Sequence, residues 1–167
     1  AALIAVVVYW RKGLRRVESF FRGARGEERV ANILGDLPES YHVFHDCVAG
    51  GEHVDHVVAG PTGVFSVETK NWRGSVVVSE GHVLVNGALP SRDPVLQAQR
   101  EADRVRSKLK RIGFDMTVVP VVCFATDTLA EGVSSCGSVS VMNASRTLDW
   151  IPSQAECISD SDLARLV

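Results

Sequence analysis

Two acids and a lysine occupy positions where a buried strand would normally carry Val, Ile or Thr. Asp55 lies in the apolar stretch HVDHVVAG, and both Glu68 and Lys70 lie in the next one, GVFSVETK. Side chains of a strand alternate between its two faces, so Glu68 shares a face with Lys70. Asp55 shares a face with Val57 and Ala59 of its own strand. If those two faces coincide, the three charged groups converge near the strand ends.

Two carboxylates at close range repel each other, so keeping both ionised requires a positive charge between them. A divalent cation fits that role. Mg²⁺ (or Mn²⁺) prefers oxygen ligands and keeps several of its waters, so two carboxylates and a phosphate would suit it. We therefore expect Asp55 and Glu68 to be metal ligands. Lys70 would orient a water beside the metal and offset charge that builds on a phosphate during transfer.

Glu27 and Gln97 are further candidates, each near the start of an expected helix. Glu27 lies three residues before Val30, on the side of Val30 and Leu34, so we expect it to project towards the sheet while Glu28 faces water. Gln97 lies in the first turn of its helix, beside the apolar stripe, where its amide could hydrogen-bond a site residue or a nucleotide. Each also has an ordinary explanation, as an acid favoured by the helix dipole or as an exposed glutamine.

A helix is expected before the strands. The pattern over residues 14–37 is helical, with an interruption near Gly23 and Gly26, and Pro38 stops it. Period-2 patterns bounded by turn residues then predict strands in residues 41–48, 53–60 and 63–70. Residues 74–88 predict a hairpin that turns at Glu80 and Gly81.

The clearest helix covers residues 91–113, where Asp93 is a good N-cap and Pro94 occupies the first helical position. An apolar run over residues 116–125 is typical of a strand covered on both faces, although Pro120 is unusual inside one. A short strand at residues 138–142 and a last helix within residues 159–167 follow. This order predicts an α/β fold with a mixed sheet. At 167 residues, 46% of them apolar and 23% charged, the chain suits one globular domain.

The net charge of −2 gives no overall basic field, but the charge is unevenly distributed. Residues 11–29 contain seven basic residues against three acids, and so do residues 92–111. Such segments are either solvated helix faces or surfaces that bind phosphate. The candidates for phosphate contacts are Arg73, Arg100, Arg104 and Lys108. Trp72 could stack on a base or pack at the rim of the site.

The cysteines and histidines give little support for another metal. The four cysteines are far apart and no CxxC pair occurs, so we expect free thiols in a reducing compartment, or a disulfide if the domain is exported. A zinc site at His53, Asp55 and His56 is an alternative. It is a weak one, because the two histidines point to opposite faces of a strand.

The first ten residues, AALIAVVVYW, are apolar and are followed by Arg11 and Lys12. A bilayer crossing needs about 20 apolar residues. Aromatic residues followed by cations are nevertheless typical of the cytoplasmic end of a transmembrane helix. Because the chain does not begin with Met, we expect residues 1–12 to be the end of such a helix, with a single domain at residues 13–167 on the cytoplasmic side of the cell membrane. The alternative is an apolar element of a cytoplasmic domain.

The spacing D-x12-E-T-K, from Asp55 to Lys70, resembles the signature of the PD-(D/E)XK nuclease superfamily. More narrowly, the chain resembles the nuclease-related domain (NERD). GARGE, VDHVVAGPTGVFSVETKNWRG and DPVLQ are similar to the GxxGE, the central block and the Asn/Asp-Pro-x-x-Gln of that family, in the same order. The D…ExK spacing alone is a weak signal, whereas the ordered combination is specific. Together the motifs span about residues 20–125.

The resemblance implies a restriction-endonuclease-like αβββαβ core, with a mixed central sheet flanked by helices. It also implies a metal-dependent (endo)nuclease that hydrolyses the phosphodiester bonds of nucleic acid. We expect DNA rather than RNA as the substrate, Mg²⁺ or Mn²⁺ as the metal, and no organic cofactor. It fits a membrane tether, since such domains often follow a transmembrane segment. The alternative is a catalytically silent module of the same fold that binds nucleic acid or acts as a scaffold.

Carried over to this chain, the resemblance makes Asp55 and Glu68 the metal ligands and Lys70 the group that positions the attacking water. Glu27 becomes an accessory acid, and Gln97 supports the site. Two positions depart from the family pattern, a threonine between Glu68 and Lys70 and a valine in place of the proline before Asp55. Neither departure removes a catalytic group.

Overall fold

The computed structural model describes Glu18 and residues 20–167. The first helix runs through residues 20–34. The elements that follow are β1 (His42–Ala49), β2 (Glu52–Gly60), β3 (Gly63–Lys70), β4 (Val76–Ser79), β5 (His82–Val85), α2 (Pro94–Arg111), β6 (Val118–Phe124), β7 (Val133–Cys136), β8 (Val139–Asn143), a 3₁₀ turn (Ala144–Arg146), α3 (Thr147–Trp150) and α4 (Asp160–Leu166).

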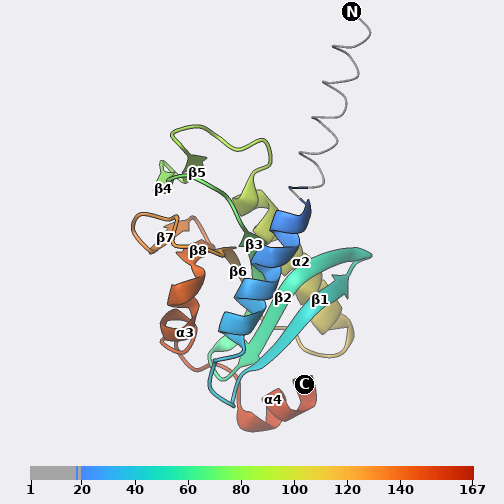
Figure 1. Ribbon diagram of the computed structural model, residues 1–167. Coiled ribbons are helices and arrows are strands. Elements are labelled where there is room, and N and C mark those ends of the chain that lie inside the picture. The colour runs from blue at the N-terminus through green and yellow to red at the C-terminus, as the bar shows by residue number, and fades with distance from the viewer. Residues whose placement is uncertain (1–17, 19) are drawn as a thin grey trace, which may run out of the picture.

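Six strands form one central sheet in the order β1-β2-β3-β6-β8-β7. β1, β2 and β3 are antiparallel neighbours, β3, β6 and β8 are parallel, and β7 is antiparallel to β8. The predicted mixed sheet and the αβββαβ order are therefore confirmed. β4 and β5 form the predicted hairpin, with positive φ at Glu80 and Gly81, but it is a separate two-stranded sheet (Figure 1).

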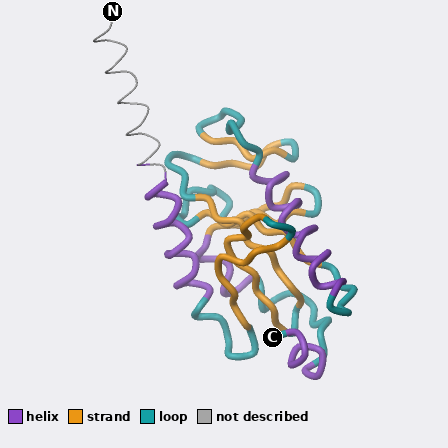
Figure 2. The backbone as a smooth tube through the Cα atoms, turned by 90° about the vertical axis from the view of Figure 1, so that its right-hand side faces the viewer, coloured by secondary structure: helices purple, strands orange, loops and turns teal. Residues whose placement is uncertain are grey.

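The first helix and α2 cover opposite faces of the central sheet (Figures 1 and 2). Phe65 and Val67 of β3 pack with the first helix. Val64 of the same strand packs with Ala102 of α2. Because strand side chains alternate, Glu68 is in phase with Val64 and faces α2. β3 thus contributes to the core on one face and to the site on the other.

The expected interruption of the first helix at Gly23 and Gly26 is wrong, because the helix continues through both. Gly26 instead marks a close contact with the chain just after β3. A Cβ atom on Gly26 would lie 2.6 Å from the Cβ of Asn71. Asn71 Nδ2 also donates a hydrogen bond to the Arg22 carbonyl oxygen at 2.8 Å. The glycine therefore allows the helix to approach the end of β3.

The start of α2 is as predicted. The Asp93 carboxylate accepts hydrogen bonds from the backbone N–H groups of Val95 and Leu96, and Pro94 opens the helix. This N-cap supplies partners for N–H groups that the helix itself leaves unpaired. It fixes the first turn of α2, and with it the position of Gln97, against the sheet.

Pro120 lies inside β6, opposite Ser66 of β3. The ladder between β6 and β8 begins one residue later, at Val121. On the β8 side, proline therefore has no ladder partner to lose at this position. β7 has no counterpart among the predicted strands, because its sequence, VSSC, is short and half polar.

All four cysteines are free thiols. Among the described residues, no helix is long and apolar enough to cross a membrane. The expected transmembrane segment, residues 1–12, lies outside the described residues.

Candidate active site

Asp55 and Glu68, the carboxylate pair, lie side by side on the face of the sheet that α2 covers. The register of β2 and β3 pairs His56 with Val67, so Asp55 and Glu68 occupy the next opposing positions. The backbone N–H of Thr69 donates a hydrogen bond to Asp55 Oδ2 at 2.8 Å. The faces of the two strands therefore coincide, and the sheet brings the two carboxylates together.

Both carboxyl groups have raised pKa values, chiefly because burial disfavours the charged form. Burial raises the pKa of Asp55 to about 7, and the charge of Glu68 adds to the effect. Glu68 is only 3% exposed, and burial raises its pKa to about 8, although Lys70 acts in the opposite direction. Such a pair favours either bound protons or a bound cation.

Lys70 is held between a carboxylate of the pair and α2. Its Nζ donates to Glu68 Oε1 and to Gln97 Oε1, the latter at 3.0 Å. The ammonium group has three N–H donors, so one remains for another acceptor in the cleft. The structure thus brings together four of the predicted residues, Asp55, Glu68, Lys70 and Gln97.

Glu101 is a further acid in the site that was not predicted. Gln97 Nε2 donates to Glu101 Oε1 at 3.1 Å, and the charge of Glu101 adds to the raised pKa of Glu68. Glu101 is 3% exposed, and burial raises its pKa. Its signal in the sequence is its place on the buried stripe of α2, between Ala98 and Val105. A search for apolar residues alone passes over it.

A cleft of about 640 Å³, the carboxylate cleft, opens beside these groups. It lies at the carboxyl end of β3, which runs parallel to β6, and such strand ends are where α/β sheets commonly bind ligands. The predicted site residues in its wall are Glu27, Asp55, Glu68, Lys70 and Gln97. Glu27 differs from the others because it is exposed, although its charge contributes to the raised pKa of Asp55.

The donor groups of this cleft suit Mg²⁺ or Mn²⁺. Glu68 Oε2 and Glu101 Oε2 are buried and have no hydrogen-bond partner among the described residues, so the site has carboxylate oxygens to offer. No His or Cys is among the described residues that line the cleft. The structure holds no ready-made group of three His, Cys, Asp or Glu side chains for a metal in its described part. Two carboxylates are enough for Mg²⁺, which keeps several waters.

The alternative zinc site does not assemble. His53 is exposed and its Nδ1 lies 2.6 Å from Asp46 Oδ1. His56 is buried on the opposite face, where its Nδ1 lies 2.9 Å from Nδ1 of His45. The two histidines therefore cannot share an ion with Asp55.

The four predicted phosphate-binding residues differ in what they already contact. Arg104 forms an ion pair with Glu52 at 2.9 Å, and Lys108 Nζ donates to a backbone carbonyl oxygen of β1 at 2.9 Å. Arg73 has a 79% exposed side chain, 4.0 Å from Glu18. Arg100 is exposed and forms no ion pair with any described residue. Arg73 and Arg100 are thus the better placed for phosphate.

Trp72 lies at the rim of the carboxylate cleft. It is partly buried, and its ring centroid lies 5.6 Å from that of Phe124. It therefore combines a packed inner edge with an edge open to the cleft.

Residues 22–125 match the family model of the nuclease-related domain. An uncharacterized protein of Bacillus anthracis is 37% identical over 84 residues, which cover 47% of this chain and 40% of that protein. The chain thus spans less than half the length of this relative. No solved structure matches the chain.

Proposed function

Because the chain belongs to the nuclease-related domain family, we propose that it is a divalent-metal-dependent nuclease that hydrolyses phosphodiester bonds of DNA. The observation that carries the proposal is the carboxylate pair with Lys70 in contact, at the end of β3 and open to a cleft. A module that only binds nucleic acid has no need of buried acids beside a phosphate. Metal-assisted hydrolysis does need such acids, because they hold the cation beside the phosphate.

Asp55 and Glu68 would hold Mg²⁺ or Mn²⁺. When bound, the cation would draw charge from the phosphate and ease the loss of a proton from water. Glu27, at the opening of the cleft, would be an accessory acid whose charge adds to the field at Asp55.

Lys70 would orient the attacking water. Two of its three N–H donors are engaged by Glu68 and Gln97, which fixes the direction of the third. A fixed donor stabilises charge on the phosphate without reorganising during the reaction. Lys70 would therefore act both on the water and on the transition state.

Glu101 would position Lys70 through Gln97. Glu101 accepts from the Gln97 side-chain N–H₂ group, so the side-chain oxygen of Gln97 must face Lys70. Without Glu101 the Gln97 amide could rotate and present N–H groups to the ammonium. Lys70 would then lose an acceptor and its fixed direction.

Exposed arginines around the cleft, Arg73 and Arg100 first, would bind phosphates. Arg104 and Lys108 already have partners and would join them with their remaining N–H donors. Binding should then weaken as salt increases.

The N-terminal stretch is the candidate for a membrane tether. Its apolar residues end in Tyr9 and Trp10 and are followed by Arg11 and Lys12, the arrangement of a cytoplasmic membrane boundary. Membrane fractionation of the full-length product tests the tether. Recovery wholly in the soluble fraction would contradict it and leave the nuclease proposal unaffected.

The activity is tested by incubating the purified chain with single-stranded, duplex and nicked DNA, and with RNA, with Mg²⁺ or Mn²⁺ and with a chelator. Asp55→Asn and Glu68→Gln should abolish hydrolysis. Lys70→Ala should still bind metal and lose about 10²-fold in rate. Asp103→Asn is the matched control, since Asp103 is an exposed acid of α2 outside the cleft. Hydrolysis that survives chelation would refute the mechanism, and metal binding without hydrolysis of any substrate would favour the silent module.

A further inference from the structure

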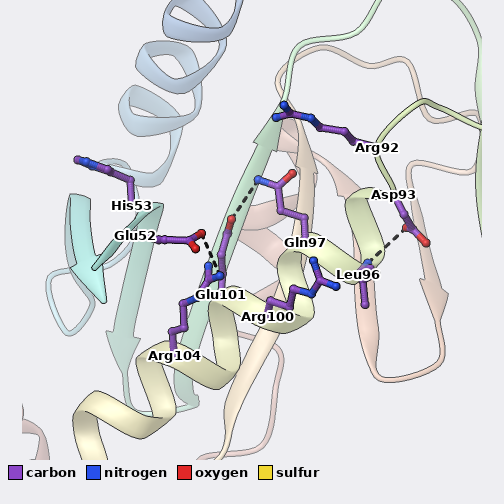
Figure 3. Close-up of a pocket in the computed structure, with 9 residues that line it drawn as sticks. All are labelled: Glu52, His53, Arg92, Asp93, Leu96, Gln97, Arg100, Glu101 and Arg104. Atoms are coloured by element: carbon purple, nitrogen blue, oxygen red, sulfur yellow. Dashed lines mark hydrogen bonds and ion pairs between the residues drawn. The ribbon is translucent and has the colours of Figure 1, made fainter. Parts of the chain in front are cut away.

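Two more clefts adjoin the carboxylate cleft, and they share different parts of its wall. One, of about 490 Å³, shares Arg22, Asn71 and Trp72 with it. The other, of about 440 Å³, shares Arg92 and Gln97 (Figure 3). The carboxylate cleft thus has a neighbouring cleft at each of two parts of its wall, and the three clefts together are called the groove.

The first side of this groove, the Arg25 side, is basic and carries aromatic rings. Its arginines are Arg22, Arg25 and Arg73. Arg25 forms no ion pair within the part of the chain that the structure describes, and Arg22 pairs with the exposed Glu18. An exposed pair of this kind contributes little to stability, so a phosphate can replace it. Phe21 is 57% exposed and offers a face on which a base could stack.

The second side, the Arg100 side, carries arginines as well, together with the acids Glu52, Asp93 and Glu101. Figure 3 shows Arg92 and Arg100 with Gln97 between them, and both arginines are exposed. Neither forms an ion pair with another described residue, whereas Arg104 is paired with Glu52. Exposed arginines thus lie on both sides of the groove.

We propose that a nucleic acid strand lies along the whole groove, with its phosphates held on the Arg25 side and on the Arg100 side. The phosphate that reaches the carboxylate pair is then an internal one. A groove closed at one end would stop the strand and select a terminus, whereas this site has a neighbouring cleft with exposed arginines at two different parts of its wall. The site therefore needs no free strand end. The cleavage of an internal bond rests on the proposed nuclease function. The path of the strand along the groove does not depend on that function.

Binding tests the path without any hydrolysis. The Glu68→Gln variant is titrated with a covalently closed circle of single-stranded DNA and with the linear strand of the same sequence. We expect similar affinity for both. Arg25→Gln and Arg100→Gln should each lower the dependence of log K on log salt by about one. Arg111→Gln is the control, because Arg111 is exposed on the same helix but lies outside the three clefts, and it should change nothing.

Hydrolysis of the circle by the unaltered chain with Mg²⁺ or Mn²⁺ is the second readout, and we expect the circle to be opened at a rate similar to the first cut in the linear strand. Degradation of the linear strand with the circle intact would overturn the proposed path and leave the nuclease function standing. A salt dependence of binding that falls in only one of the two variants, Arg25→Gln or Arg100→Gln, would also overturn the proposed path. If no DNA is hydrolysed but both arginine variants lower the salt dependence of binding, the nuclease proposal fails and the proposed path holds.

Discussion

At the scale of single residues, a charged Asp55 lowers the free energy of unfolding when no cation is bound. Its pKa is raised to about 7, so the folded chain binds this proton more tightly than the unfolded chain, in which the pKa is about 4. The folded state therefore holds more protons between about pH 4 and about pH 7, and the free energy of unfolding falls as the pH rises through that window.

Asp55→Asn should therefore stabilise the metal-free chain at about pH 8 and have little effect at about pH 4. The amide keeps an acceptor for the Thr69 N–H and removes the repulsion by Glu68. At the higher pH we expect a rise in melting temperature of about 2 °C or more, measured by thermal unfolding with a chelator present. Equal melting temperatures at that pH would show that Asp55 is not under electrostatic strain.

Glu101→Leu should separate stability from activity. Leucine removes a buried carboxyl group with an unpaired oxygen, so we expect the melting temperature to stay constant or rise. The value of kcat should nevertheless fall while KM changes little, because Lys70 loses its fixed direction. Glu101→Gln, which keeps a polar group beside Gln97, should retain more activity than leucine. A leucine variant with full kcat would limit Glu101 to a structural role.

Most of these residues were predictable, and the reason is local. Alternation along two strands placed Asp55 with Glu68 and Lys70, and the helix start placed Gln97. The position of Glu101 follows from the same helical periodicity. Its apolar neighbours made the stripe look like core alone, so Glu101 was not predicted as a site residue. The partners of Arg104 and Lys108 could not be predicted, because they come from the β1–β2 hairpin and depend on how α2 packs against it.

At the scale of elements, the two glycines of the first helix have different roles. In a helix interior, glycine is destabilising by roughly 0.5–1 kcal/mol relative to alanine. At Gly23 a Cβ would meet Glu27 Oε1 at 3.9 Å and no other atom within 4 Å in the part of the chain that the structure describes. At Gly26 it would meet Asn71 at 2.6 Å.

Gly23→Ala should thus stabilise the chain by up to about 1 kcal/mol. Gly26→Ala should destabilise it, because the helix must move away from the end of β3. Urea unfolding of both variants is the measurement. Stabilisation by alanine at both positions would show that the contact between Gly26 and Asn71 yields at no cost.

Local propensity explains why the helix was expected to break and did not. Glycine disfavours a helix on its own, and nothing local indicates that Asn71, far along the chain, comes close to Gly26. Pro120 is similar, because only the late start of β8 makes a proline acceptable in β6. The order of helices and strands was predictable because each long element carries its own periodicity, whereas β7 is too short and polar to do so.

At the scale of the whole molecule, a cation should act as a stabilising ligand. One that binds only the folded state raises the melting temperature by mass action. Its carboxylate ligands must first lose their protons, so the shift should grow as the pH rises from about 6 to about 8. Thermal unfolding with Mg²⁺ or Mn²⁺, and then with a chelator, measures it. A shift of the same size in Asp55→Asn would place the cation elsewhere on the chain.

The hydrogen bond from Thr69 to Asp55 gives the site a spectroscopic reporter. The backbone amide of Thr69 donates to the carboxylate, so its ¹H and ¹⁵N chemical shifts should follow the charge on that oxygen. In an NMR titration the Thr69 resonance would move with a midpoint near the Asp55 pKa of about 7, and would move again when a cation is added. The Thr69 amide can therefore report on the protonation of Asp55 and on cation binding, even in a sample that shows no hydrolysis of nucleic acid.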